Sequence, residues 1–204
     1  MGPVTILIRS DRELAQLIRF FGPTGQPILT EGYASDYEAL VRAIISQQIS
    51  TSAARAITAR LLQNLGDGGI TPESVSLLTE TGLRFLGMSK AKAGYILGLA
   101  HSLLNGDVDL LHVHRLGDEE AVVSLQTIKG VGRWTAQMFA ITQMGRPDIF
   151  PVGDAGIKSA MIKLYRLSPQ VPDSELVTLA NNWKPYRTLA CLFLWKGLDG
   201  GYFQ

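Results

Sequence analysis

Two glycines two positions apart mark the segment of the chain that is best suited to binding an anion. They lie in Leu125-Gln126-Thr127-Ile128-Lys129-Gly130-Val131-Gly132-Arg133-Trp134-Thr135-Ala136, which ends one predicted helix and begins another. Because glycine has no side chain to obstruct the turn, the backbone N–H groups of Gly130 and Gly132 can approach a phosphate at the start of the second helix. Lys129 and Arg133 add positive charge beside the turn. A bare Gly-x-Gly is also typical of a plain helix-turn-helix corner, which binds no ligand.

One carboxylate, Asp154, follows this hairpin in Phe150-Pro151-Val152-Gly153-Asp154-Ala155-Gly156-Ile157-Lys158 and precedes a helical run. In that position the side chain is expected to cap the helix, an interaction that stabilises a helix by roughly 1 kcal/mol. An ionised carboxylate in a water-poor cleft can also stabilise positive charge that develops on a reacting group. A helix cap and a catalytic group can be the same residue, so both hypotheses stand.

Apolar residues recur at helical spacing along nearly all of the 204 residues, as in Leu14, Leu17, Ile18 and Phe21, and this predicts an all-α fold. Only Val4–Ile8 looks like a strand. About ten short helices are expected. Their start signals are Asp11, Ser35 or Asp36, Ser50, Thr71 before Pro72, Ser89, Asp118 and Pro172-Asp173-Ser174. Loops rich in helix breakers are expected at Gly22–Gly32, Gly66–Thr71 and Gly145–Gly153, the last being the expected boundary between two lobes.

The composition excludes several classes of protein. With 46% hydrophobic and 18% charged residues the chain can bury a core, yet it has no apolar run long enough to cross a bilayer. The start, Met1–Ser10, lacks the pattern of a secretory signal. One cysteine, Cys191, excludes a disulfide framework and a four-cysteine zinc or iron-sulfur site, and is expected to be a buried apolar side chain. Because the net charge is only +1, any binding of nucleic acid must depend on local donors.

The hairpin closely resembles the helix-hairpin-helix of the DNA glycosylase superfamily, and the segment around Asp154 resembles the one that carries its catalytic aspartate. Further blocks resemble the 3-methyladenine DNA glycosylase II branch, namely Tyr37–Ser50, Leu86-Gly87-Met88-Ser89-Lys90, and Trp183-Lys184-Pro185-Tyr186-Arg187 through Trp195. The likeness runs from about Asp11 to Gly197 and lacks the large α/β lobe of the best-known bacterial members. It implies a single domain over 1–204, with a middle helical lobe of about 36–148, a second lobe of about 1–35 plus 149–204, and the active-site cleft between them.

The resemblance implies roles for the hairpin and for the turns near it. In this family, hairpin carbonyls hold a monovalent Na⁺ or K⁺ ion that bridges to a phosphate; by position these are the carbonyls of Gln126, Ile128 and Val131. The residues implied in phosphate binding are Lys90, Lys129, Arg133 and the backbone amides of Gly130, Gly132 and Thr135.

Gln48, with Ile49, is the candidate to fill the space that a flipped-out base leaves behind. A glutamine at a helix end that bonds the backbone is an equally good interpretation. The other cations nearby, Arg42, Arg55 and Lys92, could contact phosphate, although scattered helix cations usually form only an ordinary solvated face.

Trp134 indicates which branch of the superfamily is the better match. Bifunctional members, which also nick the strand, place a nucleophilic lysine two residues after the second hairpin glycine, where this chain has Trp134. Without an amine there, water is the expected nucleophile and an abasic site the expected product. Asp154 would stabilise the oxocarbenium-like sugar. No cofactor is expected for catalysis, and the missing cysteines exclude the iron-sulfur cluster of the endonuclease III branch.

Three further side chains, Trp134, Met138 and Trp195, are implied by the resemblance to line the substrate pocket beside Asp154. Bases such as 3-methyladenine and 7-methylguanine are cationic, and an indole face attracts a cation by roughly 0.5 to 2 kcal/mol. The alternative is that all three belong to the core, which for Met138 is as good an interpretation, since methionine commonly fills gaps between helices.

These implications describe a monofunctional glycosylase that removes alkylated purines from duplex DNA in base excision repair. A monomer is expected, located in the cytoplasm (nucleoid) of a bacterium or archaeon or in the nucleus of a eukaryote. Two alternatives are a helix-hairpin-helix module that binds DNA without cutting a bond, and a mismatch or oxidised-base glycosylase, against which the missing lysine and cysteines weigh. A third, a helical interaction protein, would not explain the ordered set of blocks.

Overall fold

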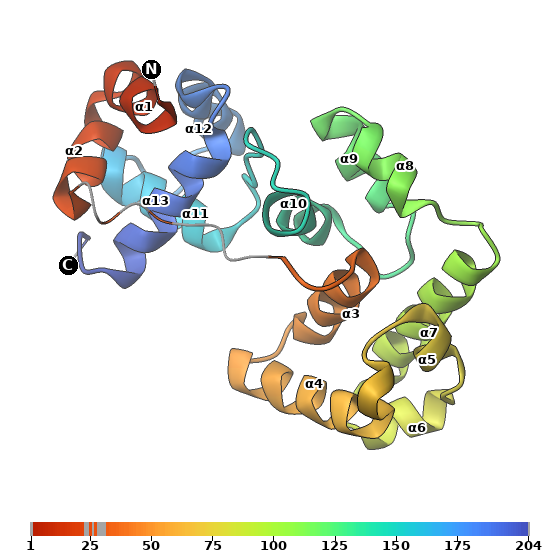
Figure 1. Ribbon diagram of the computed structural model, residues 1–204. Coiled ribbons are helices and arrows are strands. Elements are labelled where there is room, and N and C mark those ends of the chain that lie inside the picture. Colours follow the sequence, from red (N-terminus) through yellow and green to blue (C-terminus); the bar gives the residue numbers. More distant parts are fainter. Residues whose placement is uncertain (1, 23–24, 26, 28–31, 204) are drawn as a thin grey trace. The chain divides into compact units, whose positions relative to one another are not determined.

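The computed structural model describes residues 2–22, 25, 27 and 32–203, and every regular element among them is a helix (Figure 1). The prediction of an all-α fold is therefore confirmed. The described residues form thirteen α-helices instead of about ten, because α5 (Pro72–Ser76), α6 (Glu80–Phe85) and α8 (Leu110–Arg115) are single short turns. The chain divides into two compact units, Glu31–Met144 and Met1–Thr30 with Gly145–Gln204.

The unit Glu31–Met144 is organised around α7 (Lys90–Leu104), which packs against α3, α5 and α6. Helix α10 packs against α3 and α9. The remaining elements of this unit are α3 (Asp36–Ser46), α4 (Thr51–Leu65), the 3-10 helix η2 (Gly66–Gly68), α9 (Asp118–Leu125) and α10 (Arg133–Thr142). The hairpin between α9 and α10 thus lies on a frame of packed helices.

Polar side chains begin the helices at most of the predicted positions. The side chains of Asp11, Ser35, Ser50, Thr71 and Ser89 each accept a hydrogen bond from the backbone N–H three residues later. Helix α9 starts differently, because Gly117 is its N-cap and the Gly117 N–H donates to the Glu120 carboxylate at 3.0 Å. Asp118 is therefore the first residue of the helix and not its cap.

The other unit consists of α1 (Pro3–Ser10), α2 (Arg12–Phe21), α11 (Ala155–Tyr165), α12 (Asp173–Ala180), the 3-10 helix η3 (Asn181–Trp183) and α13 (Arg187–Asp199). Helices α2 and α11 both pack against α13. Its core includes the fully buried Leu7, Trp183 and Phe193. Helix α13 therefore lies against both α2 and α11.

The strand predicted at Val4–Ile8 is wrong, since these residues lie within helix α1. Pro3 occupies the first helical position, where its fixed φ favours the start of a helix. Val4, Leu7 and Ile8 then fall on one face and pack into the core of the unit. Tertiary packing of this face outweighs the strand preference of the β-branched side chains.

Two further findings concern the length of the helices and the predicted loops. None of the helices among the described residues is long and apolar enough to cross a membrane. The predicted loop Gly66–Thr71 contains η2, and most of the predicted loop Gly22–Gly32 lies outside the described residues.

A buried carboxylate, Asp11, joins three helices of this unit. Its Oδ1 accepts from the Leu14 N–H at 2.9 Å and so caps α2, while Oδ2 accepts from the Trp183 indole at 3.0 Å and from the Tyr165 hydroxyl. Burial, and then the bond to Asp11, raise the pKa of Tyr165 and keep its hydroxyl a donor. Asp11 therefore links α2 to α11 and η3 through one side chain.

Replacing Asp11 with alanine removes a helix cap and leaves two donors without their acceptor. We expect Asp11→Ala to lower the free energy of unfolding by about 3 kcal/mol, combining the two kinds of loss. Urea unfolding measures this change. Asp173→Ala is the matched control, because Asp173 pairs with Lys158 on the surface and should contribute under about 1 kcal/mol. Equal losses in the two variants would contradict the role of Asp11.

Candidate active site and hairpin

Asp154 lies at the start of α11 and caps it, as predicted. Its Oδ1 accepts a hydrogen bond from the Ile157 N–H at 2.9 Å. The same oxygen accepts from the indole Nε1 of Trp195 at 3.0 Å, so the structure brings these two predicted site residues together. Both partners are N–H donors, and Oδ1 therefore serves as an acceptor of the kind that a carboxylate provides.

A small residue, Gly156, allows this close contact. A Cβ atom at position 156 would lie 3.1 Å from Asp154 Oδ1 and 3.3 Å from Nε1 of Trp195. Those distances are tighter than most Cβ contacts, so a larger residue would require the indole or the carboxylate to shift by a few tenths of an ångström. Sequence reasoning did not single out Gly156, although it stands within the motif that carries Asp154.

The segment that leads to Asp154 is tied to the first turn of α13. Arg187 donates from Nε to Oδ1 of Asp148 at 2.8 Å and from Nη2 to Oδ2 at 2.9 Å, a bidentate pair. The buried Thr188 hydroxyl donates to the Arg146 carbonyl at 2.7 Å and accepts from the Ile149 N–H at 3.0 Å. Since α13 also carries Trp195, one helix fixes both the approach to Asp154 and its indole partner. These residues were not predicted.

Cys191 lies on the same helix and is fully buried, as expected for an apolar side chain. Burial, and then the negative charge of Asp154, raise the pKa of the Cys191 thiol. The thiol therefore stays protonated and packs as a small hydrophobic group.

The hairpin connects α9 to α10 by a turn in which the two glycines have different tasks. Gly130 has φ +92°, and a Cβ there would lie 2.4 Å from Cδ2 of Tyr95, so only glycine fits. Gly132 is the N-cap of α10 with φ −82°, and a Cβ there would meet open space. The open side at Gly132 gives a ligand access to the first turn of α10, as an anion site requires.

Two charged side chains stand at the hairpin, Lys129 and Arg133, and Arg133 forms an ion pair. Arg133 donates from both terminal nitrogens to the Glu119 carboxylate, at 2.7 and 2.9 Å, and this pairing raises its pKa. Lys129 is exposed. A phosphate contact by Arg133 would therefore have to compete with Glu119.

The carbonyls predicted to hold a cation lie in the same turn. The Ile128 carbonyl accepts from the Val131 N–H at 2.9 Å, while the Gln126 side chain bonds back to the Val122 carbonyl. A carbonyl oxygen has two lone pairs, so one hydrogen bond leaves it able to bind a hard cation. Within the described part of the chain, no three His, Cys, Asp or Glu side chains gather as a metal site.

The turn between α3 and α4 carries the predicted gap-filling residues. Gln48 is exposed and has φ +56°, and Ile49 is 38% exposed. Lys90 is an exposed first residue of α7. Of the other cations, Arg55 is exposed and Arg42 pairs with Glu38 one helical turn away at 2.6 Å, whereas Lys92 donates to two backbone carbonyls and so has partners beyond a solvated face.

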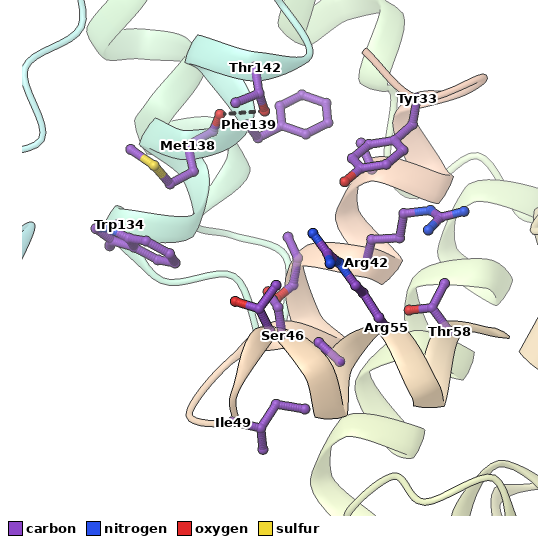
Figure 2. A pocket seen from close by; sticks show the side chains of 14 residues that line it. Tyr33, Arg42, Ser46, Ile49, Arg55, Thr58, Trp134, Met138, Phe139 and Thr142 are labelled. Carbon is purple, nitrogen blue, oxygen red and sulfur yellow. Dashed lines mark hydrogen bonds between the residues drawn. The ribbon is translucent and has the colours of Figure 1, made fainter. Parts of the chain in front are cut away.

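A pocket of about 520 Å³ opens in the unit Glu31–Met144, between α3, α4 and α10 (Figure 2). Trp134 and Met138 lie on one side of it, and Arg42, Arg55 and Thr58 on the other. Trp134 is 43% exposed and Met138 is half-buried, so neither belongs to the core. Trp134 and Met138 thus share one wall, and Asp154 and Trp195 share a hydrogen bond in the other unit; that the two pairs form one site stays a prediction.

Comparison with known proteins shows which family the chain resembles. Residues 41–186 match the model of the HhH-GPD superfamily base excision DNA repair protein. The chain is 31% identical to the alkylbase DNA glycosidase-like protein mag2 of Schizosaccharomyces pombe, over 91% of this chain and 88% of that protein. It is 34% identical to DNA-3-methyladenine glycosylase 1 of the same organism, over 78% and 71%.

Solved structures agree with the sequence relatives. The DNA-3-methyladenine glycosidase of Bacillus halodurans superposes with a TM-score of 0.87 at 30% identity, covering 99% of this chain and 91% of that one. The S. pombe 3-methyladenine DNA glycosylase in complex with abasic DNA gives 0.84 at 28% identity, covering 98% and 97%. This chain, with its helical fold, its hairpin and its aspartate-capped helix, therefore belongs to the HhH-GPD superfamily of base excision DNA repair proteins.

Proposed function

We propose that this chain is a monofunctional DNA glycosylase that removes alkylated purines, such as 3-methyladenine and 7-methylguanine, from duplex DNA and leaves an abasic site. The observation that carries the proposal is the Asp154 carboxylate, held at the start of α11 by the Ile157 N–H and the Trp195 indole. Relatives whose names specify DNA-3-methyladenine glycosylase activity support the choice of substrate.

The reaction needs a fixed negative charge beside the sugar. Cleavage of the N-glycosidic bond builds positive charge on C1′, and a pre-oriented carboxylate stabilises that charge without reorganising in the transition state. In the proposed mechanism Asp154 supplies this charge and orients the attacking water. Because an alkylated purine is already cationic, it leaves as a neutral base and needs no general acid.

The pocket supplies the second part of the proposal. Trp134 and Met138, which line the pocket, and Trp195, which does not line it, are the proposed contacts of the cationic base. An indole face attracts such a base by roughly 0.5 to 2 kcal/mol. The guanidinium of Arg55 points into the pocket of Figure 2 and would repel a cation. We therefore expect the base to lie at the Trp134 end and not at the Arg55 end.

The hairpin supplies a general anchor on DNA. We propose that the amides of Gly130, Gly132 and Thr135, with Lys129, Arg133 and Lys90, bind phosphates, and that the Gln126, Ile128 and Val131 carbonyls hold a Na⁺ or K⁺ ion. Oxygen donors in one tight turn suit such an ion. Gln48 and Ile49 would fill the gap left by the flipped base.

Gly132→Asp tests the anchor. The open space and negative φ at Gly132 predict that the variant folds, while its charge faces the proposed phosphate. Affinity for damaged and undamaged duplexes should fall alike, by about tenfold or more, as expected for losing one charge-assisted contact. Fluorescence anisotropy on both duplexes measures it, with Gly132→Ala as the uncharged control. Loss confined to the damaged duplex would contradict a general anchor.

Sodium borohydride tests the monofunctional assignment. With Trp134 where an amine would have to stand, no imine with the sugar forms, so borohydride should trap no covalent protein–DNA adduct during turnover. Denaturing gels with labelled DNA report the adduct, and a glycosylase that has the hairpin lysine serves as the positive control. A trapped adduct would shift attention to Lys129 or the chain terminus and would end the monofunctional assignment.

Asp154→Asn tests the catalytic role. Asparagine keeps the cap and an acceptor for the Trp195 indole but removes the charge, so single-turnover excision from methylated DNA should fall about a hundredfold or more, with DNA affinity nearly unchanged. Asp109→Asn is the matched control, since Asp109 caps α8 in the same way through the His112 N–H at 2.9 Å. Excision by Asp154→Asn at a near wild-type rate would remove Asp154 from the mechanism and favour the DNA-binding module.

A further inference from the structure

We propose that Lys92 and Gln47 are positioning residues, which fix the Gln48 turn to the hairpin so that anchoring on phosphate also places the gap-filling side chain. The inference rests on the proposed function, because Gln48 acts only if a base leaves the duplex. It concerns two residues that contact neither the base nor Asp154.

The Gln48 turn needs such support because of its backbone. Helix α3 ends at Ser46, and Gln48 has φ +56° before α4 begins. The left-handed region is unfavourable for a non-glycine residue, which stays there only where its surroundings hold it. Gln48 is exposed, so the support must come from its neighbours.

Lys92 holds the backbone on the N-terminal side of the turn. Its ammonium donates to the Ile45 carbonyl at 2.8 Å and to the Gln47 carbonyl at 2.7 Å. Carbonyls at the end of a helix lack partners within the helix and carry its negative dipole end, so a cation is well suited to them. Partial burial lowers the pKa of Lys92, as expected for an amine drawn from solvent toward the protein.

Gln47 connects the same turn to the hairpin. Its side-chain Nε2 donates to the Gly130 carbonyl at 2.9 Å and to the buried Thr135 hydroxyl at 3.2 Å. The residue whose carbonyl Lys92 holds therefore reaches both the hairpin and the first turn of α10. The turn and the hairpin are directly bonded to each other.

Helix α7 supplies a common reference for both structures. Lys92 and Tyr95 lie three residues apart and so share a face of α7. Lys92 holds the turn, and the Tyr95 ring lies where any side chain at Gly130 would have to be. A displacement of the hairpin relative to Gln48 would break contacts to one rigid helix, so the two move as one body.

The test uses the purified full chain with three single variants, one double variant and one control variant, Lys90→Met. Lys92→Met removes the charge, Lys92→Arg keeps it, and Gln48→Ala removes the gap-filling side chain. The first readout is fluorescence of 2-aminopurine placed beside a methylated purine, which reports unstacking on binding and does not require excision. The others are single-turnover excision and affinity for undamaged duplex.

Lys92→Met should reduce both the fluorescence rise and duplex excision, excision by about tenfold, while affinity for undamaged duplex stays within about twofold. Lys92→Arg should restore most of both. If Lys92 acts through Gln48, then Lys92→Met with Gln48→Ala should be no slower than Gln48→Ala alone, since residues acting in series are not additive. Lys90→Met is the control for an exposed cation on the same helix, and should lower affinity for all duplexes.

Two results would overturn the inference. A fall in undamaged-duplex affinity for Lys92→Met, with a smaller salt slope, would make Lys92 a phosphate contact. Additive losses in the double variant would show that Lys92 acts independently of Gln48. Absence of excision by the wild-type chain would instead reject the proposed function, and the 2-aminopurine signal would still report whether Lys92 positions the turn.

Discussion

One oxygen atom, Oδ1 of Asp154, accepts from the start of its own helix and from an indole on another helix. This double contact constrains the elements around it. Gly156 must be small, α13 must lie close to the beginning of α11, and the connection before Asp154 must follow α13. The bidentate Asp148–Arg187 pair and the buried Thr188 hydroxyl satisfy the last requirement. A carboxylate that stabilises positive charge in a transition state needs such fixed donors, because the stabilisation is greatest when the carboxylate does not have to reorient.

In the unit Glu31–Met144 the constrained groups are backbone segments, namely the hairpin and the Gln48 turn. Its hairpin depends on glycine at position 130 for two reasons, the positive φ and the Tyr95 ring. The Gln48 turn depends on bonds from Lys92 and Gln47. At Gly130 the positive φ costs little because the residue is glycine, whereas at Gln48 it is unfavourable and is stabilised by bonds from α7 and to α10. Strain of this kind is typical of segments that must present particular groups to a ligand.

Electrostatics in this protein are local. The net charge of +1 provides no general attraction to DNA, and several cations already have protein partners. Arg133 pairs with Glu119, Arg42 with Glu38, and Lys92 with backbone carbonyls. In the proposed function, phosphate binding would therefore depend on the hairpin amides and on single exposed cations such as Lys129 and Lys90, and not on total charge.

The sequence by itself determined the helical class, most helix starts, the hairpin and the capping position of Asp154. These depend on local rules, since helical spacing, cap residues and glycine turns act over three or four residues. Only the tertiary structure decided that Val4–Ile8 is helical, because packing of one face outweighed strand preference. It also decided that Lys92 faces the α3 terminus, that Gly156 admits Trp195, and that Asp148 and Thr188 bind α13. Those partners lie tens of residues away in the chain, and spacing within a single segment carries no information about which distant side chains meet.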